Sequence, residues 1–308
     1  MKNNRKCLSP KAFEDAATFI RSQARPLEVA RFDHIFNGAD VADVLSELKK
    51  FQNADGGFGH ALEADLRAPE SSALCTSIAF QIIREHQISG GEEMVQQGMR
   101  YFADTLDRSE LHWRIIPETA GGSPHAPWWT QEGRDTFSLN PNSEILGYLL
   151  DYGESVIDER IVSQLTDRIV ESLRSMKEIE MHDLLCCLRL LDSKNLPPVI
   201  SQSVLKELKR LISGAVSTNP EQWKEYGLRP LQVVNCPDSP FIDGLEEAIS
   251  LNLEYELNEQ QDNGSWAPTW SWGDTYSETW EVAIREWSGW LTLEKLLILK
   301  RFDCIEYP

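Results

Sequence analysis

The segment Gln52-Asn53-Ala54-Asp55-Gly56-Gly57-Phe58-Gly59 decides the fold that we predict for this chain. A second segment, Gln261-Asp262-Asn263-Gly264-Ser265-Trp266, has the same order: a glutamine, a few turn residues, then an aromatic residue. The two segments lie about 208 residues apart in a chain of 308. Because one motif recurs far apart in the chain, we expect stacked helical repeats rather than one irregular bundle.

Each segment has the composition of a tight turn at the end of a helix. Glycine accepts positive φ angles without strain, and Asp and Asn favour turns. We expect the glutamine amide to bond the carbonyl groups left open at the end of the preceding helix. The aromatic side chain should cover the turn and pack beside the next helix.

Apolar residues recur with helical spacing along most of the chain, which predicts an all-α fold. The stretches with this spacing are 41–51, 75–83, 157–173, 184–191, 204–212, 242–253 and 280–301. Ser71 or Ser72 is the expected N-cap of the second stretch, and we expect the last one to break near Gly289. The alternation typical of strands is absent, and no linker divides the chain, so we predict a single domain spanning 1–308.

The composition limits the partners of the chain. It has 30 basic and 49 acidic residues, a formal net charge of −19, which repels nucleic acid and anionic membrane surfaces. No apolar run approaches the roughly 20 residues of a membrane span, and the first ten residues lack the apolar core of a secretory signal. The six cysteines have no CxxC spacing, which is typical of reduced thiols. We therefore expect a cytoplasmic protein that neither binds nucleic acid nor spans a membrane.

The two glutamine segments resemble the QW-type repeat of the terpenoid-cyclase and protein-prenyltransferase superfamily. This resemblance implies an α/α toroid, in which inner and outer rings of helices surround a central cavity for an isoprenoid or other hydrophobic ligand. The catalytic motifs of these enzymes are absent: the sequence has no Asp-x-Asp-Asp string, no Asp-Asp-x-x-Asp string and no Asp-x-Cys zinc element. Similar turns occur in pectate lyases and complement-type thioester domains, so the motif indicates a fold more than a reaction.

The segment from His60 to Arg67 follows the first glycine turn directly. In a toroid this position leads to one mouth of the cavity. Glu63 and Asp65 are the candidate catalytic acids, and His60 and Arg67 are candidate ligand-binding residues, Arg67 as an anion clamp. Alternatively, the two acidic residues cap the helix that begins near Ser71, because carboxylates are stabilised at helix N-termini.

Asp183 is a further candidate catalytic acid, at the start of a predicted helix. His182 and Cys186 lie four residues apart on one face of that helix, a spacing that a zinc site can use. A core helix with small buried cysteines and a capped N-terminus explains the same residues without a metal, and we predict no metal site. Glu144, near the start of another predicted helix, is expected to be an electrostatic cap.

Ten tryptophans are more than a chain of this size usually has, and several fall in predicted loops. The candidate ligand-binding tryptophans are Trp113, Trp128, Trp129, Trp270, Trp272 and Trp280. Indole faces stabilise cations, including carbocations, and they also stack on sugar rings. Alternatively, these rings fill the interior and fasten loops together.

Three functions follow from these patterns. The first is a terpenoid-cyclase- or prenyltransferase-like protein that binds a small hydrophobic molecule in an aromatic central cavity. The second is a carbohydrate-active toroid, a lyase or hydrolase that uses a carboxylate pair, and the third is a non-catalytic binding toroid. Asp274, Glu278 and Glu281 offer such a pair, although a solvated acidic face explains them better at this net charge. The sequence leaves open whether the protein is an enzyme and which cofactor it takes.

Overall fold

The computed structural model describes residues 6–129, 136–154 and 156–308. Within these residues the fold is helical, and β-pairing is limited to isolated bridges, so the predicted all-α class is confirmed. The chain forms two compact units. Unit 1 comprises residues 1–47 and 216–308, and unit 2 comprises residues 48–215.

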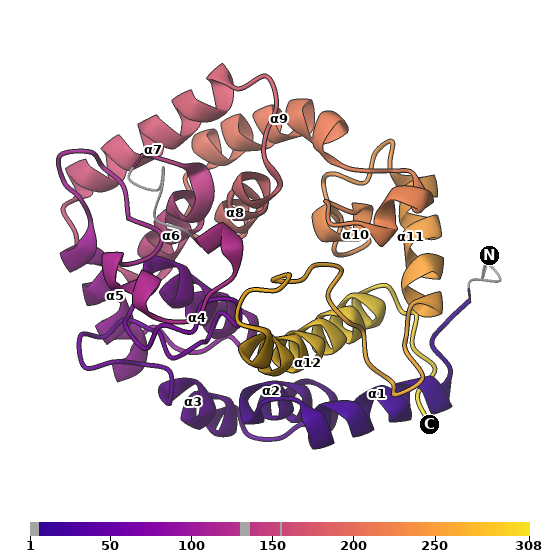
Figure 1. Ribbon diagram of the computed structural model, residues 1–308. Coiled ribbons are helices and arrows are strands. Elements are labelled where there is room, and N and C mark those ends of the chain that lie inside the picture. Colours follow the sequence, from indigo (N-terminus) through magenta and orange to yellow (C-terminus); the bar gives the residue numbers. More distant parts are fainter. Residues whose placement is uncertain (1–5, 130–135, 155) are drawn as a thin grey trace. The chain divides into compact units, whose positions relative to one another are not determined.

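Unit 2 is built from two layers of helices. Its helices are α4 (Ala73–Glu85), α5 (Glu93–Thr105), α6 (Leu139–Tyr152), α7 (Glu159–Ser175), α8 (Met181–Leu191) and α9 (Pro198–Ala215), with the short 3-10 helices η1 (Glu118–Gly122) and η2 (Pro127–Trp129) before α6. Neighbours in one layer are α4, α6 and α8, against which α5, α7 and α9 pack (Figure 1). The apolar stripes form the core between them, as Leu165 and Ile169 of α7 illustrate. Of the two expected caps, Ser72 is the N-cap of α4, and its Oγ accepts the Cys75 N–H at 2.9 Å.

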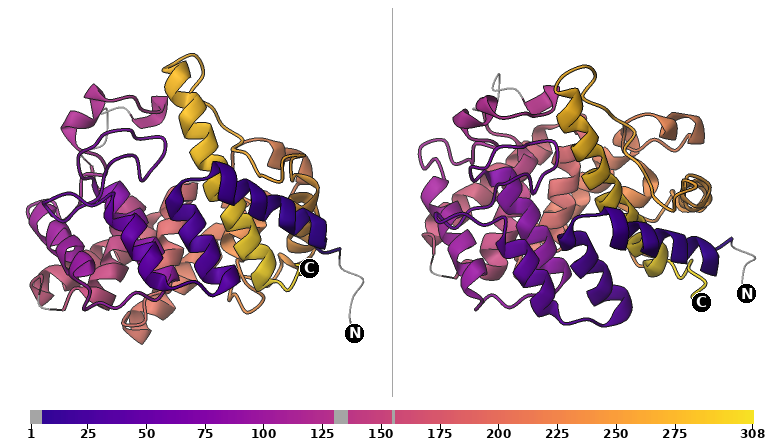
Figure 2. Two further views of the ribbon diagram at one scale, coloured as in Figure 1. Left: turned by 90° about the horizontal axis from the view of Figure 1, so that it is seen from below. Right: turned by 60° about the horizontal axis from the view of Figure 1, so that its bottom comes forward.

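Unit 1 combines the two ends of the chain. Its elements are α1 (Pro10–Gln23), α2 (Pro26–Asn37), most of α3 (Val41–Lys49), η3 (Pro220–Lys224), α10 (Pro230–Val233), α11 (Glu246–Asn258) and α12 (Ser277–Arg301). Both α1 and α2 pack against the long helix α12 (Figure 2). As predicted, none of the helices in the described residues is long and apolar enough to cross a membrane.

The predicted break near Gly289 is wrong, because α12 continues through this residue without interruption. Gly289 is buried, and a Cβ atom on it would lie 2.6 Å from the Cβ atom of Ala24. The missing side chain thus allows the connection between α1 and α2 to approach α12 closely. Here glycine serves helix packing rather than helix termination.

The first glycine turn connects three segments of unit 2. The side-chain amide of Gln52 donates to the carbonyl oxygen of Gly56 at 2.8 Å and to that of Met94, on α5, at 2.9 Å. The backbone N–H of Phe58 donates to Oγ1 of Thr76, on α4, at 3.0 Å. The prediction that the glutamine bonds the end of its preceding helix is therefore wrong. The amide instead ties the turn to the second helix that follows it.

The second glycine turn repeats these bonds within unit 1. The amide of Gln260 donates to the carbonyl oxygen of Gly264 at 2.9 Å and to that of Ala12, on α1, at 2.8 Å. The backbone N–H of Trp266 donates to Oγ1 of Thr292, on α12, at 3.0 Å. The glutamine equivalent to Gln52 is therefore Gln260 and not Gln261, with which the predicted segment begins.

Both turns need glycine at their tightest point. The φ angles of Gly56 and Gly264 are 88° and 89°, in the left-handed region. A Cβ atom on Gly56 would lie 2.4 Å from the carbonyl oxygen of Gln97, and one on Gly264 would lie 2.3 Å from that of Asp15. Conformation and close approach both exclude a side chain there.

The two repeats differ in how the chain connects their helices. In unit 2 the helices that receive the turn, α4 and α5, follow it in the sequence, whereas in unit 1 they are α12 and the N-terminal helix α1. The Leu8 N–H donates to the Cys304 carbonyl at 2.9 Å, and the Glu306 N–H donates to the Leu8 carbonyl at 2.9 Å. These bonds join the two chain ends, so the first helix of the chain completes the last repeat.

A third copy of the arrangement is present in unit 2 around Trp113. Its backbone N–H donates to Oδ1 of Asn142, on α6, at 3.0 Å, and its indole N–H donates to the Phe102 carbonyl, on α5, at 2.7 Å. The indole N–H of Trp266 likewise donates to the carbonyl of Glu256, on α11, at 2.8 Å. This copy lacks the glutamine and the glycines, which explains why the sequence pattern does not reveal it.

Candidate functional site

The segment of residues 60–69, called here the carboxylate loop, connects the first glycine turn to α4. Most of its side chains are buried, although loops usually lie on the surface. Its backbone groups find partners in the segment before η2: the Ala126 N–H donates to the Asp65 carbonyl at 2.8 Å, and the Arg67 N–H donates to the Pro124 carbonyl at 3.0 Å. These bonds satisfy backbone groups that burial would otherwise leave unpaired.

The carboxylate loop begins with two strained residues. His60 and Ala61 have φ angles of 55° and 60°, although neither is a glycine. This conformation costs about 1–2 kcal/mol for each residue, and such strain clusters at functional sites. Two backbone bonds hold it: the His60 N–H donates to the Ala68 carbonyl at 3.1 Å, and the Leu62 N–H donates to the Gly59 carbonyl at 3.0 Å.

Glu63 is the most unusual carboxyl group of the loop. Its residue is 6% exposed, and its Oε2 atom has no hydrogen-bond partner within the described residues. Burial raises the pKa of Glu63 well above its usual range, and the charge of Asp65 raises it further. Polar interactions with the Asp65 and Leu66 backbones and with the Trp129 side chain lower the pKa without cancelling the rise. This environment favours a protonated carboxyl group, which is the form that a general acid needs.

The structure thus brings together three of the predicted site residues, Glu63, Asp65 and Trp129. The other two predicted residues of this loop lie near its ends. His60 is exposed, with Nε2 2.8 Å from Oδ1 of Asn53, and Arg67 is half-buried, with Nη1 donating to the Ala64 carbonyl at 3.3 Å.

The remaining predicted tryptophans occupy different surroundings. In unit 2, Trp113 is buried and bonds α5 and α6 in the third repeat, whereas Trp128 is 39% exposed. In unit 1, Trp272 is buried with its ring centroid 5.5 Å from that of the half-buried Trp280. Half-buried Trp270 packs edge-on between two further rings, those of Tyr226 and Trp287, at 5.6 and 5.1 Å. A surface hollow of about 500 Å³ bounded by α1, α2 and α3 contains none of these rings.

Asp183 supports the entry into α6. Its Oδ1 atom accepts the Ser138 hydroxyl and the Asn140 backbone N–H, both at 2.8 Å. Burial raises the pKa of this carboxyl group, and these two bonds oppose the rise. Its role as a catalytic acid stays a prediction, and the geometry gives it a structural task.

The residues of the alternative zinc site at the same helix have other contacts in this structure. Nδ1 of His182 lies 2.9 Å from Oε1 of Glu180. Burial raises the pKa of the Cys186 thiol well above its usual range. In the parts of the chain that the structure describes, no group of three or more His, Cys, Asp or Glu side chains is placed to hold a metal ion.

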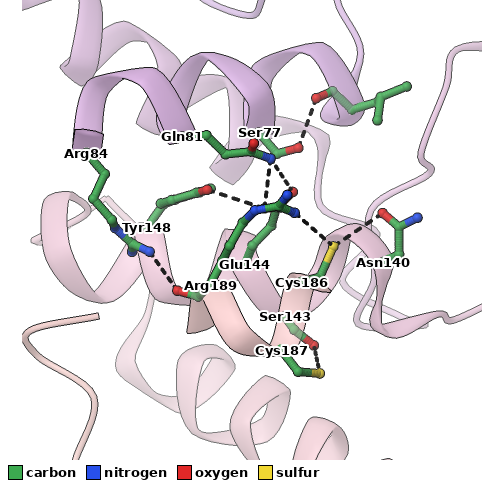
Figure 3. A network of polar contacts seen from close by, with 11 residues as sticks. Ser77, Gln81, Arg84, Asn140, Ser143, Glu144, Tyr148, Cys186, Cys187 and Arg189 are labelled. Carbon is green, nitrogen blue, oxygen red and sulfur yellow. Dashed lines mark hydrogen bonds and ion pairs between the residues drawn. The ribbon is translucent and has the colours of Figure 1, made fainter. Parts of the chain in front are cut away.

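Glu144 lies at the centre of a polar network between α4, α6 and α8 (Figure 3). Its carboxylate Oε2 atom accepts bonds from Gln81 Nε2 at 3.1 Å, Tyr148 Oη at 3.3 Å and Arg189 Nη1 at 3.1 Å. The residue is 2% exposed, so the prediction of a helix cap is wrong. The carboxylate of Glu144 instead contacts side chains on the neighbouring helices α4 and α8.

A second pair of charges extends this network. Arg84 donates to the carbonyl oxygen of Arg189 at 2.6 Å and to Asp151 at 2.9 Å, and its guanidinium lies 4.6 Å from the centre of the Tyr148 ring. The two arginines thus pair with the two carboxylates, Arg84 with Asp151 and Arg189 with Glu144. This network holds the three helices together. The sequence offered one signal of it, the single charge of Arg189 within the apolar run of α8.

No protein-family model and no curated protein matches this chain.

Proposed function

We propose that the chain closes into an α/α toroid of the terpenoid-cyclase and prenyltransferase type, and that it binds an isoprenoid-like hydrophobic ligand to which Glu63 donates a proton. The observation that carries this proposal is the buried Glu63 carboxyl group, with one oxygen free of hydrogen bonds in the described residues, beside Asp65 and Trp129. Its burial favours the protonated form of the acid, which is the form that can donate a proton.

The repeats support the closed ring. An open helical array needs capping repeats with a polar outer face at both ends. Here the first helix, α1, instead completes the repeat of the last helix, α12, through Gln260 and the bonds around Leu8. A repeat array whose two ends complete one another is expected to form a ring.

The position of the predicted site residues within the repeats also supports the proposal. Each copy of the turn is followed by a loop that carries some of them: after Phe58 come Glu63 and Asp65, after Trp113 come Trp128 and Trp129, and after Trp266 come Trp270 and Trp272. In a ring of equivalent repeats, loops at the same point of each repeat open on the same mouth. Within unit 2 the first two loops are paired through the bridge between Leu66 and His125.

The proposed step needs only groups of this chain. The O–H bond of Glu63 breaks as the proton bonds to a double bond or an oxygen of the ligand, which leaves a glutamate anion and a cationic ligand. We assign to the indole of Trp129 the stabilisation of that cation, because the π face of an indole attracts positive charge. The negative charge of Asp65 and the burial of the site then favour the return of a proton to Glu63.

Binding is tested by thermal shift with farnesol, farnesyl diphosphate with Mg²⁺ or Zn²⁺, and neutral and acidic oligosaccharides. A ligand at 100 times its Kd adds about 2.7 kcal/mol to the free energy of unfolding, which raises the Tm by several degrees. We expect a shift with the isoprenoids and a weaker one in Trp129→Ala. Stabilisation by oligosaccharides alone would favour the carbohydrate-active toroid, and no shift at all would favour a toroid without this ligand.

Proton donation is tested in D₂O, followed by mass spectrometry of the stabilising ligand. The wild type should add deuterium to the ligand, and Glu63→Gln should bind the ligand without labelling it. Glu70→Gln is the matched control, because Glu70 is an exposed carboxylate next to the same loop. Equal labelling by the wild type and Glu63→Gln would contradict the role of Glu63.

A further inference from the structure

Asn53, the second residue of the first glycine turn, has contacts that its counterpart Gln261 lacks. The side chain of Gln261 bonds within its own turn, where Oε1 accepts the Ser265 hydroxyl at 3.1 Å. The side chain of Asn53 contacts both ends of the carboxylate loop: Oδ1 lies 2.8 Å from Nε2 of His60, and Nδ2 donates to the Pro69 carbonyl at 2.9 Å. One amide therefore bonds both ends of the loop. The Asn53 side chain with its bonds to His60 and Pro69 is called here the clasp.

The chemistry of the partners fixes the direction of each bond in this clasp. A carbonyl oxygen only accepts, so Nδ2 of Asn53 faces Pro69 and its Oδ1 faces His60. Nε2 of His60 must therefore carry the proton and donate it. Nδ2 of Asn53 also donates to Oγ of Ser71 at 3.0 Å, and that hydroxyl donates to Asp55 at 2.7 Å. The clasp is thus anchored to the turn by a continuous chain of bonds.

The clasp acts at the strained end of the loop. His60, which Asn53 holds, is the first of the two residues with positive φ, and Ala61 is the second. The clasp adds to the two backbone bonds of His60 and Leu62 that hold this conformation, and its loss favours relaxation to the ordinary φ regions, which are lower in free energy. Such relaxation redirects the chain immediately before Glu63.

We propose that Asn53 and His60 are positioning residues that hold the carboxylate loop in the strained, buried conformation in which Glu63 acts as an acid. This inference rests on the proposed function, because it assigns the clasp a part in that reaction. Further charged or titratable groups on the elements packed here are Asp65 and Arg67 in the loop and His125 in the segment paired with it.

The test is a ¹³C NMR titration of the glutamate side-chain carboxyl groups, in which the Glu63 signal is the one that Glu63→Gln removes. We expect wild-type Glu63 to titrate at a higher pH than the other glutamates. His60→Ala should lower its midpoint by about one pH unit or more, because the loop opens to water. His60→Gln retains a side-chain N–H donor and should restore most of the shift. His182→Ala, a histidine partly exposed elsewhere in unit 2, should change nothing.

Three results would overturn the inference. An unchanged Glu63 midpoint in both His60→Ala and Asn53→Ala would remove the positioning role and leave the proposed function standing. Equal falls in His60→Ala and His60→Gln would remove the hydrogen bond as its basis. A wild-type Glu63 that titrates with the other glutamates would overturn both proposals. Conversely, a clasp-dependent midpoint without deuterium labelling of any ligand would overturn the proposed reaction alone. Because the His60 side chain is exposed, His60→Ala is expected to fold.

Discussion

The ionisation of Glu63 should be visible in the stability of the folded protein. Its pKa is raised above the ordinary value of 4.5, so the folded state binds a proton more tightly than the unfolded state does. This contribution to stability is therefore complete below about pH 4.5 and is lost as the pH rises toward the folded pKa. The slope for one proton reaches about 1.4 kcal/mol per pH unit in that window.

We therefore expect Glu63→Gln to become more stable relative to the wild type as the pH rises from 5 to 8. Gln occupies a similar volume to the protonated acid and does not ionise. Urea unfolding at several pH values measures the difference between the two free energies of unfolding. Glu70→Gln, at an exposed carboxylate, should show no such trend. A constant difference between Glu63→Gln and the wild type would mean that Glu63 is ionised in the folded protein throughout this range.

At the scale of the residue, the sequence predicts which acidic side chains belong to the candidate site better than it predicts their contacts. The place of Glu63 and Asp65 after a glycine turn predicts them as site residues. Their burial beside Trp129 depends on backbone bonds to residues 124–126, which no local sequence pattern encodes. Glu144 does lie near the start of α6, but the sequence does not show that its carboxylate contacts side chains of α4 and α8. Its partner Arg189 comes from another helix and was missed.

At the scale of the element, the two glycine turns should respond alike to a side chain. Alanine at Gly264 meets a positive φ, which costs about 1–2 kcal/mol, and a close contact with α1, which adds about 1–3 kcal/mol. Gly56→Ala faces the same two penalties against α5. We expect each variant to lose about 2–5 kcal/mol of unfolding free energy, measured by urea unfolding.

Gly244→Ala separates the two penalties. Gly244 has a φ of 84°, but a Cβ atom on it meets no atom within 4 Å. It should therefore lose only the conformational part, about 1–2 kcal/mol. If Gly264→Ala were no less stable than Gly244→Ala, the close packing of the turn on α1 would be refuted.

The polar network joining α4, α6 and α8 should show the coupling of a buried ion pair. Arg189→Met leaves the Glu144 carboxylate without its cation, and we expect a loss of about 2–4 kcal/mol of unfolding free energy. The lower part of that range applies if water reaches the side chain of Arg189, which is 33% exposed. Adding Glu144→Gln removes the unpaired charge and should recover part of the loss, as a double-mutant cycle measures.

The exposed pair of Lys224 and Glu221 provides the control for this cycle. Lys224→Met should change the free energy of unfolding by less than about 1 kcal/mol, since exposed pairs contribute little. Additive effects of Arg189→Met and Glu144→Gln would show that the two side chains do not interact energetically.

The helices themselves were predictable because their apolar stripes are regular, as in α7 and α9. Two features of the elements were not. From the sequence, Gly289 is expected to interrupt a helix. Only its close approach to Ala24 shows that it serves helix packing instead. The repeat around Trp113 has the hydrogen bonds of the aromatic residue but lacks the glutamine and the glycines, so the sequence pattern does not reveal it.

For the whole molecule, the sequence predicted one domain, and the structure describes two compact units, of which unit 1 is discontinuous. The sequence showed two copies of a motif and could not show that the N-terminal helix completes the second. That relation depends on contacts between residues at opposite ends of the chain, such as Gln260 with Ala12. The toroid and the single domain accordingly stay predictions.

A circular permutant tests the completion of the last repeat by the first helix. Because the Leu8 N–H and carbonyl are bonded to residues 304–306, the two ends of this chain can be joined without displacing α1 or α12. A Gly/Ser linker of about eight residues reaches up to about 28 Å, enough to connect Pro308 with Lys6. New termini between Thr218 and Asn219, both exposed, place the residues of each unit almost entirely in one continuous stretch. We expect the permutant to have the helical circular dichroism and cooperative unfolding of the wild type, with a Tm within several degrees of it.

As the matched comparison, deletion of residues 1–23 removes the acceptor of Gln260 and uncovers α12, so it should abolish cooperative unfolding of unit 1. A permutant that fails to fold, or a deletion that unfolds like the wild type, would show that α1 is not part of the final repeat.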